Sequence, residues 1–160
     1  MNKIALVTGA DGGMGTIHTR TLTQAGYEVI MACYDKEIAR PVCEKIASET
    51  GATLHQMQVD LGNLQDIIRF ANEVKAQFSR LDILLNNAGV LCHGAKNSVN
   101  GIEYTAAVNY LGHYTLTNAL LPIMGQGTRI VSMISIAYVM GKIREDFLSE
   151  TNDKKFNRFT

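Results

Sequence analysis

Residues 3–15 read Lys-Ile-Ala-Leu-Val-Thr-Gly-Ala-Asp-Gly-Gly-Met-Gly, and this stretch decides the fold class. Its apolar run at residues 4–7 predicts a short buried strand, and the spacing of the apolar residues after the glycines predicts a helix. Glycines at such a junction let the backbone approach a phosphate, while the start of the helix offers N–H groups and a partial positive charge. We therefore expect a phosphate-binding turn, with a tight turn that holds no ligand as the alternative. A P-loop is excluded, because no Lys followed by Ser or Thr closes the glycines.

The rest of the chain repeats this alternation of apolar runs and amphipathic stretches. Further strands are expected at residues 28–32, 54–59, 81–85 and 129–134. Helices are expected where apolar residues recur at helical spacing, namely at Met14, Ile17, Leu22 and Ala25; at Ile38, Val42 and Ile46; at Leu64, Ile67, Ile68, Ala71, Val74 and Phe78; and at Tyr104, Ala107, Val108 and Leu111. The alternation predicts an α/β fold, a doubly wound, Rossmann-like parallel sheet whose ligands bind beyond the carboxyl ends of the strands.

The composition limits the kinds of partner. The chain has 160 residues, 46% of them hydrophobic, which suits one folded domain. Its 15 basic and 15 acidic residues cancel, so nucleic acid and an anionic membrane surface are not expected as partners. No apolar run could span a membrane or form a signal-peptide core, so we expect a cytoplasmic protein. No metal site is expected, because Cys33, Cys43 and Cys92 have no paired spacing and only Cys92 and His93 are adjacent.

Five motifs occur in the order and spacing of one protein family. They are Thr-Gly-x-x-x-Gly-x-Gly at residues 8–15, Asp60 at the end of the third expected strand, Asn-Asn-Ala-Gly at residues 86–89, Asn109 in the long helix, and Ser135 after the fifth strand. On these motifs the chain resembles the short-chain dehydrogenase/reductase family over essentially its whole length. The resemblance implies reversible hydride transfer between a nicotinamide dinucleotide and a small-molecule alcohol or carbonyl.

The resemblance also implies roles for individual residues. The cofactor would be bound by Gly9, Asp11, Gly13, Met14, Gly15, Tyr34, Asp60, Leu61, Asn87, Ala88 and Gly89. Ser135 would bind the substrate oxygen, and Asn109 would hold the water-mediated proton relay that the family places there. Each of these two residues has an alternative role, Ser135 as a hydroxyl that caps local backbone and Asn109 as an amide that satisfies loop backbone.

The expected cofactor is NADP, with NAD as the alternative. The reason is that residues 31–35 and 108–113 are most similar to the retinol-dehydrogenase-like branch of the family. An acidic residue about 20 positions after the glycines usually binds the ribose of NAD, and Asp35 falls there. In the family's register, however, that position is Cys33, and Tyr34 stands where NADP-dependent members carry arginine.

One part of the family pattern is not matched. The family's proton donor is a tyrosine followed four residues later by a lysine, and Tyr138 and Lys142 have this spacing. They follow Ser135 too closely, however, and Gly141 between them disfavours a helix. We therefore expect Tyr138 to line the substrate entrance and the catalytic tyrosine and lysine to be absent.

The chain is accordingly expected to be an incomplete dehydrogenase. Residues 1–140 would form the dinucleotide-binding domain, and residues 141–160 a loop or tail that leads toward the missing catalytic helix. The fifth strand would then have an exposed edge, and a homo-oligomer is expected for the full-length protein. Tyr110 and Tyr114 are expected to pack within the fold. The alternative function is a nucleotide-binding module without turnover, whereas Asn-Asn-Ala-Gly and Ser135 argue against a methyltransferase or a sugar-nucleotide enzyme.

Overall fold

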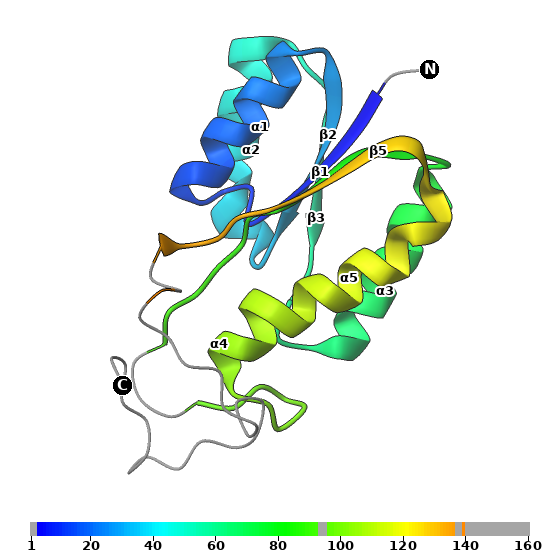
Figure 1. The fold of residues 1–160 in the computed structure, drawn as a ribbon. Coiled ribbons are helices and arrows are strands. Elements are labelled where there is room, and N and C mark those ends of the chain that lie inside the picture. The colour runs from blue at the N-terminus through cyan, green and yellow to red at the C-terminus, as the bar shows by residue number, and fades with distance from the viewer. Residues whose placement is uncertain (1–2, 93–95, 137–138, 140–160) are drawn as a thin grey trace.

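The computed structural model describes residues 3–92, 96–136 and 139 and shows a five-stranded sheet flanked by helices (Figure 1). The strands are β1 (Lys3–Thr8), β2 (Tyr27–Cys33), β3 (Leu54–Gln58), β4 (Leu81–Asn86) and β5 (Met124–Ser132). The helices are α1 (Gly13–Gln24), α2 (Lys36–Thr50), α3 (Leu64–Gln77), α4 (Tyr104–Ala106) and α5 (His113–Leu120), with a π-helical segment η1 (Ala107–Gly112) and a 3₁₀ turn η2 (Leu121–Ile123). Neighbouring strands pair in parallel in the order β3-β2-β1-β4-β5, which confirms the predicted doubly wound fold.

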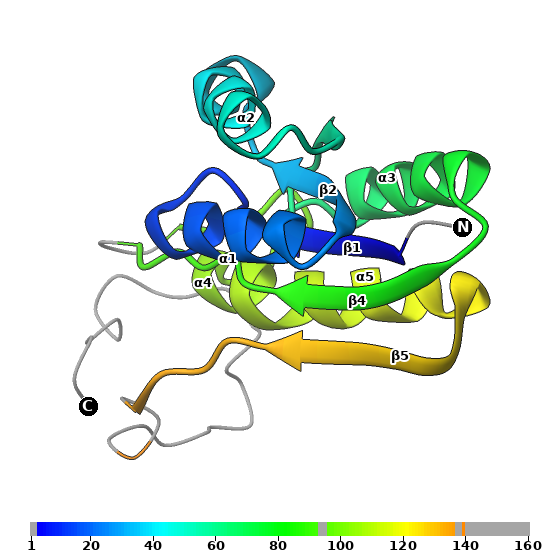
Figure 2. The same cartoon turned by 90° about the horizontal axis from the view of Figure 1, so that it is seen from above.

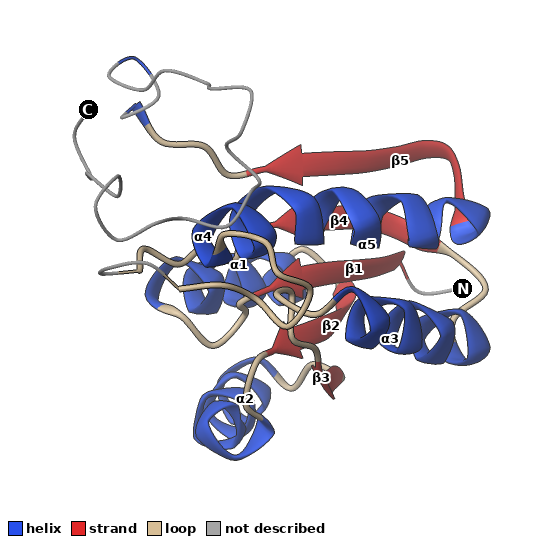
Figure 3. Cartoon of the chain, turned by 90° about the horizontal axis from the view of Figure 1, so that it is seen from below, coloured by secondary structure: helices blue, strands red, loops and turns tan. Residues whose placement is uncertain are grey.

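The central strands are covered on both faces, and alternate residues of β1 divide between the two layers. Ile4 and Leu6 join the core that includes buried residues of α3 and α5. Ala5 and Val7 join the second core, to which α1 and α2 contribute. Figures 1 and 3 show these two pairs of helices on opposite sides of the sheet.

The fully buried positions of α1 carry small residues rather than its large apolar ones. Met14 and Ile17, whose spacing predicted the helix, are 53% and 60% exposed. The buried positions are instead Gly15, Thr19 and Thr23. Small side chains let the helix lie close to the strands, so the predicted helix is confirmed although its fully buried positions are not the large apolar ones.

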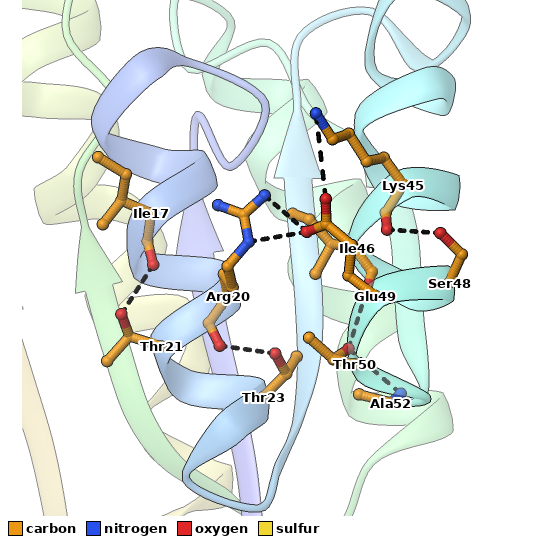
Figure 4. Close-up of polar contacts among 10 residues, drawn as sticks. All are labelled: Ile17, Arg20, Thr21, Thr23, Lys45, Ile46, Ser48, Glu49, Thr50 and Ala52. Atoms are coloured by element: carbon orange, nitrogen blue, oxygen red, sulfur yellow. Dashed lines mark hydrogen bonds and ion pairs between the residues drawn. The ribbon is translucent and has the colours of Figure 1, made fainter.

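Polar contacts then complete the packing of α1 against α2 (Figure 4). Arg20 on α1 forms an ion pair with Glu49 on α2, with Nη2 2.9 Å from Oε2. The buried Thr23 hydroxyl donates to the Arg20 carbonyl at 2.8 Å, so its oxygen has a partner inside its own helix. Burial of Thr23 is therefore compatible with its polar hydroxyl, whereas the hydroxyl of the buried Thr19 has no hydrogen-bond partner among the described residues.

β5 is one of the two edge strands of the described sheet and lies next to β4 (Figure 2). It covers Met124–Ser132 rather than the predicted residues 129–134, because the glycine-rich start of the strand carries no apolar pattern yet still follows β4. Ile130 and Val131 are 48% and 45% exposed, as expected for an edge. Ser135 lies three residues beyond the strand, not at its end.

The long helix predicted from Tyr104 is interrupted. Its first turn, α4, passes into the π-helical segment η1 before α5 begins at His113. Tyr110 and Tyr114 do not pack inside the fold, since they are 54% and 60% exposed, and that expectation was wrong. Leu116 and Leu120 of α5 are the residues that join the core instead.

Some expectations concern residues that the structure does not describe. Tyr138, Lys142 and the predicted tail at residues 141–160 lie outside the described ranges, as does His93. Among the helices that are described, none has the length and apolar character needed to cross a bilayer.

Candidate functional site

A cleft of ≈ 890 Å³ opens beyond the carboxyl ends of the strands. This volume falls within the range of small-molecule and cofactor sites. Every residue to which the sequence analysis gave a catalytic or cofactor-binding role lines it, namely Gly9, Asp11, Gly13, Met14, Gly15, Tyr34, Asp60, Leu61, Asn87, Ala88, Gly89, Asn109 and Ser135. The structure therefore brings the predicted site together, while the roles of these residues toward a ligand stay predictions.

The glycine turn is shaped by close backbone contacts. Gly9 has a positive φ of 59°, and a Cβ there would lie 3.0 Å from the Ala88 Cα. A Cβ on Gly15 would lie 2.0 Å from the Gly9 carbonyl oxygen, whereas a Cβ on Gly13 would meet no atom within 4 Å. Gly9 and Gly15 are thus needed for the turn itself, and Gly13 leaves open space on the cleft side.

The N-terminus of α1 is available to an anion. Its N-cap is Gly12, which provides no side-chain hydrogen bond, and no acidic residue lies in the first turn. The first N–H groups of a helix have no intrahelical partner, and they carry the positive end of the helix dipole. Together with the space beside Gly13, these groups form a cradle that fits a pyrophosphate.

The loop after β3 forms the next wall of the cleft. Asp60 Oδ1 accepts a hydrogen bond from the Gly62 N–H at 2.8 Å, which leaves the other carboxylate oxygen for a donor in the cleft. The ring of Tyr104 closes this wall and carries Lys96 on its face, with Nζ 3.9 Å from the ring centroid. Burial and the charge of Asp60 raise the pKa of Tyr104, so its phenol stays protonated.

The Asn-Asn-Ala-Gly segment is tied to the glycine turn through Thr8. The Thr8 Oγ1 atom accepts from the backbone N–H groups of Asn87 at 2.9 Å and Ala88 at 3.0 Å. The Asn87 side-chain amide donates back to the carbonyls of Thr8 at 2.8 Å and Gly9 at 3.2 Å. These bonds join the ends of β1 and β4, the neighbouring strands between which the chain reverses its direction of winding.

Asn109 lies in the π-helical segment, where its side chain binds loop backbone. Its Oδ1 accepts from the Val90 N–H and its Nδ2 donates to the Val90 carbonyl, both at 2.8 Å. The amide therefore fixes the loop that follows the Asn-Asn-Ala-Gly segment, as the alternative role predicted. π-helical turns often occur at functional sites, and a role for Asn109 toward a substrate is compatible with this contact.

Asp35, which follows β2, has a structural role of its own. The Asp35 carboxylate accepts from the N–H groups of Glu37 and Ile38 and thereby caps α2. Cys33, the register position, is fully buried, and burial followed by the nearby Asp11 raises the pKa of its thiol well above the usual range. Cys33 is thus an inert thiol, and Asp11 is the carboxylate that lies near the end of β2.

Two side chains of this region gave no signal in the sequence analysis. His113 is buried, and its imidazole contacts both Thr8 and the Asn109 carbonyl. Lys96 lies in a polar loop that has no periodicity. The Val-Asn-Tyr-Leu-Gly-His stretch did contain His113, but only its distance to Thr8 in the folded chain identifies a role. Among the described residues, no three His, Cys, Asp or Glu side chains group as metal ligands.

Comparison with known proteins agrees with this geometry. A family model described as short chain dehydrogenase matches residues 3–146. Retinol dehydrogenase 13 of Homo sapiens is 35% identical over 158 residues, which cover 97% of this chain and 47% of that protein. WW domain-containing oxidoreductase of Drosophila melanogaster is 35% identical over 136 residues, which cover 83% of this chain and 33% of that protein. The chain spans about half the length of the curated retinol dehydrogenases that it matches.

Solved structures show the same relationship. A putative uncharacterized protein from Mycobacterium paratuberculosis superposes with a TM-score of 0.81 at 32% identity, covering 94% of this chain and 54% of that one. The NADP active-site complex of Pseudomonas aeruginosa RhlG superposes with a TM-score of 0.74 at 28% identity, covering 89% of this chain and 58% of that one. With the family model matching most of the sequence and its motifs lining one cleft, the chain belongs to the short-chain dehydrogenase family.

Proposed function

We propose that the protein binds NADP(H) in the cleft and transfers a hydride between its nicotinamide and an alcohol or carbonyl substrate. The observation that carries this proposal is the meeting of the glycine turn, the Asp60 loop and the Asn-Asn-Ala-Gly segment at one cleft. NADP rather than NAD is proposed because the solved relatives include complexes with NADP and NADPH. A homo-oligomer of the full-length protein and a cytoplasmic location stay predictions.

Different residues of the cleft would bind different parts of the cofactor and the substrate. The N–H groups at the start of α1 would hold the pyrophosphate, and the free oxygen of Asp60 would accept from the adenine amino group. Ser135, which lines the same cleft, would donate to the substrate oxygen. Asn109 would act by fixing the loop at Val90. The nicotinamide supplies or accepts the hydride when it is bound.

A second function is favoured by one sequence observation. Tyr138 follows Ser135 by only three residues, and Gly141 separates it from Lys142, so these residues do not provide the family's proton donor. The 160-residue chain would then be a nucleotide-binding module without turnover.

The two functions are distinguished by binding followed by turnover. NADPH and NADH are titrated into the protein by fluorescence, and an alcohol and aldehyde panel that includes retinol is then tested with the matching cofactor. Binding with turnover supports the dehydrogenase, and binding without turnover supports the module. If neither dinucleotide binds, the proposed function is wrong.

A further inference from the structure

His113 is a buried polar side chain that the proposed chemistry does not use. It begins α5 directly after the π-helical segment, and its side chain reaches the end of β1. Its Nδ1 lies 3.2 Å from the Asn109 carbonyl oxygen, and its Nε2 lies 2.9 Å from the Thr8 hydroxyl. A single imidazole thus joins the helix that carries Asn109 to the strand that carries the glycine turn.

The hydrogen-bond partners determine where the imidazole proton lies. A carbonyl can only accept, so Nδ1 must carry the proton in its bond to Asn109. The two lone pairs of the Thr8 hydroxyl already accept from Asn87 and Ala88, so this hydroxyl donates its proton, and its two possible acceptors are His113 Nε2 at 2.9 Å and the Leu85 carbonyl at 3.4 Å. Nε2 of a neutral imidazole can accept that proton. The contact with His113 is the shorter of the two, so in this arrangement the imidazole is the main acceptor of the Thr8 proton and both of its nitrogens are satisfied.

Gly112, the residue before His113, allows a second close contact, between the helix and the loop after β3. A Cβ on Gly112 would lie 2.4 Å from the Leu61 carbonyl oxygen, so glycine is needed for the helix to approach the Asp60 loop this closely. Gly112 therefore fixes the helix against one side of the cleft, and His113 fixes it against the other. The π-helical segment ends between these two contacts.

We propose that His113 is a positioning residue for dinucleotide binding, which holds Thr8, and through it the Asn87–Ala88 backbone, at the distance that the cofactor requires. This inference rests on the proposed function. His113 itself touches neither cofactor nor substrate and acts through Thr8 and Asn109. The adenine side of the cleft is held separately by Gly112, so a change at His113 should affect the whole dinucleotide more than an adenine mononucleotide.

The test compares ligand affinities of His113 and Thr8 variants. His113→Phe keeps the size of the ring but loses both bonds, and it should weaken NADPH about tenfold while AMP changes by less than about twofold. Thr8→Val and His113→Phe combined should weaken NADPH by clearly less than the product of the two single effects, because both changes act on one network. His113→Gln, whose amide oxygen can accept from Thr8, should bind NADPH at least about fivefold better than His113→Asn, whose amide does not reach Thr8. This Gln and Asn pair decides the question if His113→Phe does not fold.

Each result has one meaning. Equal NADPH affinity in the wild type and His113→Phe, equal weakening of NADPH and AMP, or better binding by Asn than by Gln overturns the role of His113 and leaves the proposed function standing. Multiplicative effects of Thr8→Val and His113→Phe would also overturn it. If the wild-type chain binds neither NADPH nor NADH, the proposed function fails and this inference fails with it.

Discussion

Replacing Gly13 by valine should abolish dinucleotide binding and leave the fold intact. A Cβ at Gly13 meets no protein atom within 4 Å, and the residue lines the cleft at the start of α1. The added methyl groups would therefore occupy the space that a pyrophosphate needs. Because the substitution is at the first position of the helix and touches nothing, we expect the free energy of unfolding to change by less than about 1 kcal/mol.

The loss of affinity follows from the bonds that the side chain blocks. A hydrogen bond to a charged group contributes about 1.5–3 kcal/mol, and valine would separate the phosphate from at least two N–H groups. The expected loss is thus about 3 kcal/mol or more, which corresponds to at least about 100-fold in Kd. Gly13→Ala, with one methyl group, should give an intermediate loss.

The assay is titration of NADPH by fluorescence, with urea unfolding of each variant as the stability measurement. Gly15→Ala is the matched control, because its Cβ would lie 2.0 Å from the Gly9 carbonyl oxygen. That variant should lose about 1–3 kcal/mol of stability from overpacking. If Gly13→Val folds and binds NADPH as tightly as the wild type, the pyrophosphate does not bind at this turn.

Three other changes test other parts of the site. Asp60→Asn keeps the bond to the Gly62 N–H but loses the carboxylate charge. In competition titrations AMP should therefore bind about tenfold more weakly, while the affinity for nicotinamide mononucleotide is unchanged. Equal weakening of both ligands would indicate a structural role for Asp60. Asp11→Asn removes a negative charge near the end of β2, which should favour the ligand that carries the extra 2′-phosphate. The affinity for NADPH should therefore rise about fivefold relative to that for NADH when both are titrated. An unchanged ratio of the two affinities would mean that the 2′-phosphate of NADPH binds elsewhere. Burial lowers the pKa of His113 below 6.5, and its bond to the Asn109 carbonyl only partly offsets this, so the unfolded chain takes up the proton first as the pH falls. Urea unfolding should therefore show a loss of stability as the pH falls through the ordinary imidazole range near about 6.5. This loss should be smaller in His113→Gln, and equal losses would contradict the neutral imidazole.

The fold could be predicted because the central strands are covered on both faces and carry continuous apolar runs. β1 and β4 were found in this way, and the apolar spacing that begins at Leu64 located α3. The start of β5 was missed because edge pairing needs no apolar pattern. The buried face of α1 could not be read from its apolar residues, because close approach to the sheet selects Gly15 and Thr19 rather than large apolar side chains.

The site could be predicted only as far as its motifs reach. The glycine turn, Asp60 and the residues 86–89 follow strand ends, and parallel strands bring their carboxyl ends to one edge of the sheet. The contact of His113 with Thr8 joins residues 105 positions apart, and no local pattern encodes it. No local pattern predicts the position of Lys96 either, because its side chain lies against the ring of Tyr104, outside its own loop.

The central claim is that the start of α1 and the Asn-Asn-Ala-Gly segment bind one dinucleotide in one cleft. Amide chemical shifts of the isotope-labelled protein, followed during titration with NADP, test it most directly. The account predicts that the largest shifts occur together at the N–H groups of Gly13, Met14, Gly15, Ala88 and Gly89, with a common Kd. It would be contradicted if NADP left these amides unchanged, or if the saturating shifts occurred at residues outside the cleft.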